Sequence, residues 1–476
     1  MVTKDEDRAT KAIVVIALLG VVYAVLARVA LRGFPYSGDE YSCLLEAEIF
    51  ARGLFHVAAP PHPELLRVDH VVMDAWVRTK YPPGTSALLA LGVRAGAAWL
   101  VPPVEAVIAL VAVWHTTRAH LGGRAAMIAL AVMGLSPLFA FQAATFFAHT
   151  PTTMWLALAF AALSRWLRTR GDIWPFLAGT AIGCAFLTRP ADAVFFAVAL
   201  LVFRSRRLLV AVALGAAPLV AAYFAYQAIQ FGSPLADGYH AYEPTFRAIY
   251  HEGSGHPIAL RYLWDAKQQA NHLDQFCSLV QDWTVPGSAL VAVVGAVAIG
   301  KAHAARPMRD FVIAVAAIPA VVLLVAIADP DDGARPRYLS MALLSIAFLS
   351  GPGWDAASKA LGTLIGSGLA RATGVVALVM GPIQLGGFLG AHRIPDIWMR
   401  DGIFEEVQAL GIEQGVVIIR AEWPTRYARN GPFFDRPVLY LSAPAETTVD
   451  EVAALYPGRP VYEATEGRRW KIVRRM

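Results

Sequence analysis

The sequence predicts an α-helical protein that crosses a membrane many times, followed by a small α/β domain at the C-terminal end. Of its 476 residues, 57% are hydrophobic and only 16% are charged, whereas soluble domains are about 45–50% apolar and about 25% charged. The mean hydropathy is +0.50. Apolar stretches of about 20 residues, the length of a membrane helix, recur between short basic segments. This composition excludes an ordinary soluble enzyme.

The net charge of +5 does not indicate nucleic-acid binding, because Lys and Arg are concentrated in short loops between apolar stretches. Such loops usually lie on the cytoplasmic side of a membrane protein. The basic segments are Arg118 with Arg124, 165–170, 204–207, 301–309 and 359–371. If they and the amino terminus are cytoplasmic, two membrane helices separate each segment from the next. The carboxy terminus then lies outside.

The first apolar span, 11–31, lacks the small-residue cleavage site of a signal peptide, and we expect it to remain as an anchor. About eleven spans are expected in a membrane domain of residues 1–390. They are 11–31, 101–118, 125–144, 151–167, 173–188, 190–203, 208–229, 285–300, 311–328, 338–353 and 372–390.

Three segments remain outside the membrane: a first outer loop (33–102), a second large outer loop (231–286) and a tail (391–476). The first loop contains an apolar run after Pro83 that reads as an interfacial helix. The second is too polar to cross, and its "GYHAYEP" offers stacking aromatic rings. The tail predicts helices at 403–410 and 447–456, and strands at 415–420, 436–441, 459–464 and 468–475.

The first outer loop begins with two adjacent carboxylates, Asp39 and Glu40, in "PYSGDEYSC". The apolar residues that follow share one helical face, which predicts a capped amphipathic helix on the membrane surface. Glu46 and Glu48 are expected on its polar face. One interpretation is that Asp39 only caps this helix and Glu40 favours its positive end. The other is that the pair performs acid–base chemistry.

Several motifs accompany this acidic pair. They are "KYPPG" (80–84), "LSPLFAFQAATFFAHTPTTMWLALAFAAL" (135–163), "AFLTRPADAV" (185–194) and "GARPRYLSMALLS" (333–345). With them the sequence resembles the class C (GT-C) glycosyltransferases over about residues 10–390. More narrowly it is similar to bacterial relatives of protein O-mannosyltransferases and lipid A aminoarabinose transferases, the family 39-like group. The resemblance implies a GT-C fold and a polyprenyl-phosphate-linked sugar as donor.

The resemblance also implies residue roles. An acid beside the first membrane helix acts on the acceptor, and by position it is Asp39, with Glu40 its neighbour. A general base must take the acceptor's proton, and cations must meet the phosphate that leaves. Relatives often have an Arg three residues after the acid, where this chain has Ser42, so Lys80 is the first candidate for the donor phosphate.

Two arginines, Arg189 and Arg337, are further candidates for the donor phosphate, and Tyr81 and His149 are candidates for substrate binding. Each has a plainer interpretation. Lys80 and Arg189 can meet lipid head groups, Arg337 with Arg335 can pair with the nearby acids, and a lone His is usually structural. No metal ligand is assigned. A divalent cation at Asp329, Asp331 and Asp332 is left open beside an ordinary turn.

The predicted function is therefore an integral membrane glycosyltransferase on the outer face of the bacterial cytoplasmic (inner) membrane. Its partners are a polyprenyl-phosphate-linked sugar, membrane lipids and a lipid, glycan or protein acceptor, and no nucleic acid. Alternatives are a transporter or flippase of lipid-linked sugars, and a non-catalytic scaffold. Cys43 and Cys277 both fall in outer segments, and a disulfide between them is left open beside free thiols.

Overall fold

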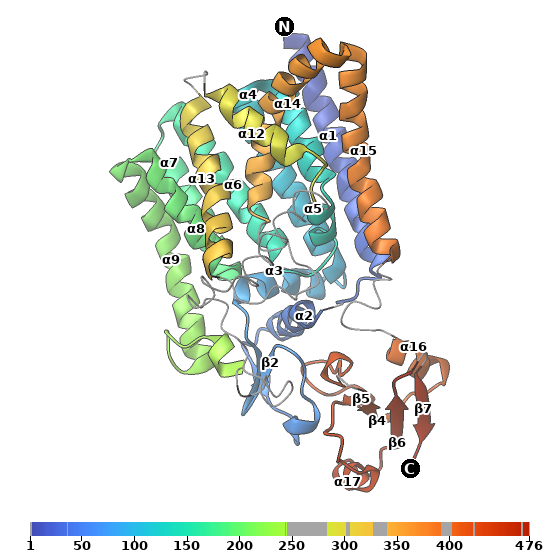
Figure 1. Ribbon diagram of the computed structural model, residues 1–476. Helices are drawn as coiled ribbons and strands as arrows, with labels where there is room; N and C mark the ends of the chain where they lie inside the picture. The colour runs from blue at the N-terminus through green and yellow to red at the C-terminus, as the bar shows by residue number, and fades with distance from the viewer. Residues whose placement is uncertain are drawn as a thin grey trace. The chain divides into compact units, whose positions relative to one another are not determined.

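The structure is a computed structural model, and it describes residues 2–35, 37–242, 244, 283–300, 305–326, 340–391, 402–421, 424–467 and 470–475. Two compact units emerge (Figure 1), and each is described by itself. The helical unit comprises Met1–Gly33, Trp99–Tyr223 and Gly255–Leu389. The mixed unit comprises Phe34–Ala98, Phe224–Ser254 and Gly390–Met476.

The helical unit follows the predicted apolar stretches closely, and one helix matches its predicted span of 173–188 at both ends. Its helices are α1 (Val2–Val25), α4 (Val101–Gly134), α5 (Pro137–Gln142), α6 (His149–Thr169), α7 (Ile173–Thr188), α8 (Pro190–Ala199), most of α9 (Arg206–Phe231), α12 (Ser288–Ile299), α13 (Arg306–Ala326), α14 (Ala342–Ile365) and α15 (Ser367–Ala391). Short π and 3-10 turns extend some of them: η1 (Leu26–Ala30), η3 (Ala98–Leu100) and η4 (Leu200–Phe203).

Small residues set the closest helix packing in this unit. A Cβ on Gly295 of α12 would lie 1.9 Å from the carbonyl oxygen of Leu349, and one on Gly353 of α14 would lie 1.8 Å from that of Val291. The two helices are therefore in backbone contact. Membrane helices commonly associate in this way, since lipid provides no hydrophobic drive to bring them together.

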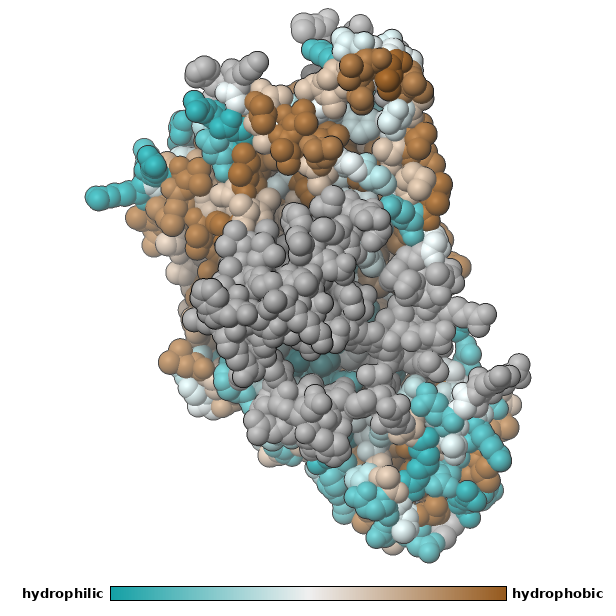
Figure 2. Space-filling model, in the orientation of Figure 1, coloured by the Kyte–Doolittle hydropathy of each residue, from teal (hydrophilic) through white to brown (hydrophobic). Residues whose placement is uncertain are grey.

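Four helical stretches in the described part of the chain are long and apolar enough to cross a membrane: Asp7–Ala30, Ala98–Gly134, Arg206–Phe231 and Ser367–Gly387. The second includes the predicted span 101–118 and the first half of 125–144, with a break at Gly122 (φ 85°, ψ 168°) near the predicted basic loop. The rest of 125–144 contains the separate helix α5. Brown apolar patches lie over α15 in Figure 2. Val375, Val376 and Ile383 of this helix are exposed. Such exposure suits lipid contact. The number of spans stays a prediction.

The mixed unit combines the first outer loop, the end of α9 and the tail. The loop forms α2 (Gly38–Ala51), β1 (Val57–Ala58), η2 (Pro63–Leu65), β2 (Val71–Met73), β3 (Trp76–Thr79) and α3 (Pro83–Arg94). The tail forms α16 (Gly402–Ala409), β4 (Gly415–Arg420), η10 (Pro424–Arg426), β5 (Val438–Leu441), α17 (Val449–Leu455), β6 (Val461–Thr465) and β7 (Lys471–Arg474). The predicted α/β tail is thus confirmed.

Two small sheets organise this unit. The loop's sheet is antiparallel in the order β1-β3-β2, and Val77 of β3 lies opposite both Val57 and Met73. The tail's sheet has the order β5-β4-β6-β7, with β4 parallel to both neighbours and β7 antiparallel to β6. Parallel strands need crossover connections. The chain passes from β5 through α17 to β6, which lies on the other side of β4.

Strand β4 is buried on both faces, as a central parallel strand usually is. Val417 and Ile419 pack in one core with Leu45 and Ile49 of α2. The alternate residues of β4 pack in a second core, which also contains Leu65 of the first outer loop. The loop and the tail therefore share both cores within one unit, an association that the prediction of a separate tail at 391–476 did not include.

Candidate functional site

The first residues of α2 form a capping box. Ser37 is the N-cap: its Oγ accepts a hydrogen bond from the backbone N–H of Glu40 at 3.2 Å, and its own N–H donates to Oε2 of Glu40 at 3.2 Å. Glu40 is only 2% exposed. The interpretation that Asp39 caps this helix is wrong, because Ser37 occupies that position and Glu40 completes the motif.

Asp39 instead turns its carboxylate toward residues from the far end of the first outer loop. The hydroxyl of Tyr81 donates to Oδ1 of Asp39. Nε2 of His70 lies 3.9 Å from the same oxygen, and both of these side chains are about one fifth exposed. Two residues predicted for the site, Asp39 and Tyr81, are thus brought into contact, together with a histidine that the sequence did not single out.

Lys80 lies among three tyrosine rings, which we call the tyrosine cage. Its Nζ is 5.1 Å from the ring centre of Tyr81, 4.9 Å from that of Tyr239 and 5.1 Å from that of Tyr242. Cations are attracted to aromatic rings within about 6 Å. The cage therefore restrains a side chain that is otherwise flexible and keeps its charge at one place.

The two additional tyrosines come from a helical segment, 238–242, that approaches the Lys80 backbone directly. A Cβ on Gly238 would lie 2.3 Å from the carbonyl oxygen of Lys80. Only glycine allows this approach, which places Tyr239 and Tyr242 against the lysine. The "GYHAYEP" motif signalled aromatic residues here, but nothing in the sequence linked it to "KYPPG".

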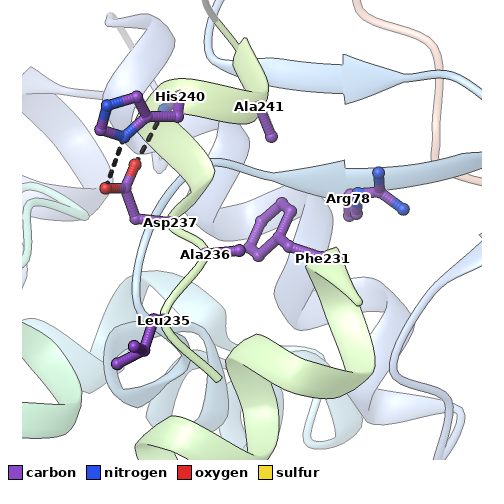
Figure 3. Close-up of a pocket in the computed structure, with 7 residues that line it drawn as sticks. All are labelled: Arg78, Phe231, Leu235, Ala236, Asp237, His240 and Ala241. Atoms are coloured by element: carbon purple, nitrogen blue, oxygen red, sulfur yellow. Dashed lines mark hydrogen bonds and ion pairs between the residues drawn. The ribbon is translucent and has the colours of Figure 1, made fainter. Parts of the chain in front are cut away.

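A cavity of about 540 Å³ lies beside the cage segment (Figure 3). The guanidinium of Arg78 on β3 pairs with Asp74 and lies 5.2 Å from the ring centre of Phe231. Asp237 accepts hydrogen bonds from the backbone N–H of His240 at 2.8 Å and pairs with its Nδ1 at 2.7 Å. The other lining residues are Leu235, Ala236 and Ala241. Its lining is thus mostly apolar, with three charged or polar side chains.

The helical unit holds a second cluster, around Arg189 at the junction of α7 and α8. The NH1 group of Arg189 lies 2.9 Å from Nε2 of His149, and its Nε donates to Asp192 at 2.7 Å. His149 and Asp192 are each 3% exposed. Two predicted residues, Arg189 and His149, thus meet. Asp192 was missed, although its spacing of three residues after Arg189 was a signal for the ion pair.

Several predictions concern residues outside the described ranges: Arg335, Arg337, Cys277 and the acids Asp329, Asp331 and Asp332. Among the described residues, no group of three or more His, Cys, Asp or Glu side chains could hold a metal ion. Cys43 and Cys184 are free cysteines. Burial raises the pKa of the Cys43 thiol well above its ordinary value, so this cysteine is a poor nucleophile.

The prediction for the exposure of Glu46 on α2 is wrong. Glu46 was expected on a polar face, but it is fully buried and its Oε1 accepts a hydrogen bond from the hydroxyl of Tyr226 at 2.5 Å. Burial raises the pKa of Glu46 to about 7. The error arose because the apolar spacing of α2 was taken to leave one side to water, whereas other elements of the unit enclose it.

Comparison with known proteins gives one family and several structures. Residues 82–229 match the family described as dolichyl-phosphate-mannose-protein mannosyltransferase. No curated protein sequence matches the chain. ArnT from Cupriavidus metallidurans, solved bound to undecaprenyl phosphate, is similar with a TM-score of 0.57 and 12% identity, over 95% of this chain and 92% of that one.

The same protein in its apo state gives a TM-score of 0.55 at 14% identity, over 96% of this chain and 93% of that one. The archaeal oligosaccharyltransferase AglB from Archaeoglobus fulgidus, solved with an inhibitory peptide and a dolichol-phosphate, gives 0.50 at 14% identity, over 96% of this chain and 69% of that one. At these identities the similarity establishes the fold. The chain is therefore a membrane protein with the class C glycosyltransferase fold, as its resemblance in sequence predicted.

Proposed function

We propose that this protein transfers a sugar from a polyprenyl-phosphate donor to a hydroxyl acceptor on the outer face of the cytoplasmic membrane. The observation that carries the proposal is the contact between Asp39 and Tyr81, because Tyr81 directly follows the caged Lys80. A carboxylate and a cation are thereby held in one cluster. These are the two groups that sugar transfer from a lipid phosphate requires.

In the proposed reaction Asp39 is the general base. It takes the proton of the acceptor hydroxyl as that oxygen attacks the anomeric carbon, and the bond from this carbon to the phosphate oxygen breaks. The leaving polyprenyl phosphate gains negative charge, which Lys80 stabilises. Attack from the face opposite the phosphate inverts the configuration at the anomeric carbon.

The tyrosine cage supports the assignment of Lys80 to the phosphate. A lysine ammonium is a point charge that suits phosphate oxygens, and its restraint lowers the entropy that binding costs. The similar ArnT was solved with undecaprenyl phosphate, and AglB with a dolichol-phosphate. Both ligands belong to the polyprenyl phosphates, the class that we propose as the donor's lipid here.

Arg189 is a second candidate cation for the donor phosphate. His149 and Asp192 contact it from two directions at 2.9 and 2.7 Å and hold its guanidinium in one orientation. Its charge is partly balanced by Asp192, so Arg189 is expected to contribute less to phosphate binding than Lys80. Exchange of Arg189 for Lys would remove the forked geometry that these two contacts depend on.

The test compares the two neighbouring acids with purified protein in lipid vesicles. Undecaprenyl-phosphate mannose, glucose and arabinose serve as donors, and lipid, glycan and protein fractions from cells lacking the protein serve as acceptors. Release of undecaprenyl phosphate gives the rate, and the labelled fraction identifies the acceptor class. Asp39→Asn is expected to lower kcat about 100-fold or more, since general-base catalysis contributes on the order of 10²–10⁴.

The matched control is Glu40→Gln. Glutamine at this position also completes a capping box, so this variant should keep nearly the full rate and the melting temperature. A normally folded Asp39→Asn variant that transfers sugar at the wild-type rate would show that Asp39 is not the base. If Glu40→Gln loses activity while Asp39→Asn keeps it, the base is Glu40.

A further inference from the structure

His70 lies beside the proposed base and next to the tyrosine cage. Its backbone has φ 64°, in the left-handed region that residues other than glycine rarely adopt. Such conformations are unfavourable, and they are retained mainly where the surrounding structure requires them. The conformation of His70 is thus a reason to ask what its side chain does.

The residue contacts both Asp39 and Lys80, through different groups. The imidazole Nε2 lies 3.9 Å from Oδ1 of Asp39, and the backbone carbonyl accepts a hydrogen bond from the N–H of Lys80 at 3.2 Å. The ring packs between aromatic side chains, with its centre 5.7 Å from those of Tyr81 and Tyr242. One residue therefore joins the carboxylate, the lysine backbone and the tyrosine cage.

The start of α2 is shaped to admit this ring. A Cβ on Gly38 would lie 2.8 Å from Cδ2 of His70 and 2.8 Å from Cβ of Asp69. Glycine at position 38, directly before Asp39, thus allows the imidazole to approach the carboxylate. A bulkier residue there would separate the two groups.

We infer that His70 is a positioning residue for the proposed base. Tyr81 donates a hydrogen bond to Oδ1 of Asp39. The imidazole lies against the same oxygen at 3.9 Å and limits the space in which the carboxylate can rotate about its Cβ–Cγ bond. The orientation of the base toward the acceptor hydroxyl then depends on the imidazole. This inference rests on the proposed function and adds a residue that the family resemblance did not indicate.

A purely structural role makes the opposite prediction for two substitutions. Glycine adopts φ 64° without penalty, so His70→Gly should keep the wild-type activity if the backbone conformation is all that position 70 supplies. His70→Gln retains an N–H donor at about the reach of Nε2, but it remains strained at this backbone position. A structural role therefore ranks Gly above Gln in activity, and a positioning role ranks Gln above Gly.

The control residue is His62, in the same outer loop. It also has positive φ (57°), and its Nδ1 lies 3.4 Å from Glu64, with the side chain 39% exposed. Both substitutions are made at each histidine, and kcat, KM for undecaprenyl-phosphate sugars and melting temperature are measured.

The expected result is a kcat for His70→Gly about tenfold or more below wild type, with KM for the donor changed by less than about twofold, because misplaced reacting groups mainly slow the chemical step. His70→Gln should keep kcat within about threefold of wild type. The His62 variants should leave kcat unchanged.

The inference is overturned if His70→Gly reacts as fast as His70→Gln or as wild type, or if the His62 variants lose as much kcat. Failure of the proposed function is recognised separately. In that case wild type releases no undecaprenyl phosphate, or Asp39→Asn is fully active whatever the His70 variants do. If Asp39→Asn is inactive and His70→Gly is normal, only the role of His70 fails.

Discussion

A lysine side chain loses much rotamer freedom when it is held in one place, and Lys80 is held by three aromatic rings at about 5 Å. The cage therefore positions the Lys80 ammonium group before the donor binds. The two neighbouring carboxylates, Asp39 and Glu40, also have different contacts. One carboxylate contacts Tyr81, and its neighbour closes the helix cap.

Removing one ring of the cage should weaken donor binding. Tyr239→Ala is expected to raise KM for undecaprenyl-phosphate sugars roughly 2- to 10-fold, because a less restrained lysine must be ordered when the donor binds, at about 0.5–1.5 kcal/mol. Tyr239→Phe keeps the ring and is the control, with KM close to wild type. Binding of undecaprenyl phosphate to each variant gives an independent measurement. Equal affinities for the Ala and Phe variants would exclude a role for this ring.

The same helix that carries Asp39 contains a buried acid two turns later. Glu46 on α2 bonds to Tyr226 near the end of α9, within the mixed unit. Because burial disfavours the charged form, the pKa of Glu46 is raised to about 7 from its ordinary value of 4.5. Ionisation of Glu46 should therefore loosen the packing of α2.

The sign of the pH effect follows from this raised pKa. The folded protein binds the Glu46 proton more tightly than the unfolded chain does. Protonated Glu46 therefore adds to the free energy of unfolding in full below about pH 4.5, and this contribution is lost as pH rises through about 7. The loss amounts to roughly 3 kcal/mol.

Glu46→Gln cannot ionise and should remove this part of the stability decline. Melting curves between pH 4.5 and 8 compare wild type, Glu46→Gln and Glu413→Gln, which changes an exposed acid of the tail. Glu46→Gln should gain stability relative to wild type as pH rises. Parallel pH dependences for all three proteins would contradict the assignment.

At the scale of the whole molecule, the basic loops predict the orientation in the membrane. The predicted cytoplasmic segments include 165–170, and the predicted outer segments include the tail. In a chain whose three cysteines are replaced by serine, Gln414→Cys in the tail should react with a membrane-impermeant maleimide in intact cells.

Thr169→Cys, in the basic segment, is the matching control and should react only after the cells are opened. Both positions are exposed, so accessibility within the protein does not limit labelling. Labelling of the tail only in opened cells would overturn the predicted orientation.

The membrane helices and the tail were predictable because their signals are local. A helix such as α7 needs only a run of apolar residues, and the tail's strands alternate or run apolar over a few residues. The basic residues near Gly122 signalled a break in α4. Asp39, Lys80 and Tyr81 were predicted as site residues through motif resemblance, and the structure brings Tyr81 into contact with Asp39.

The sequence by itself thus determined the helical membrane class and the α/β tail. Only the tertiary structure decided which residues meet. The meeting of His70 with Asp39, of the tyrosine cage with Lys80 and of the tail with α2 joins segments far apart in the chain. Contacts of this kind depend on glycines such as Gly38 and Gly238, where a Cβ atom would collide with another segment of the chain. Which segment approaches each glycine is decided only when the chain folds.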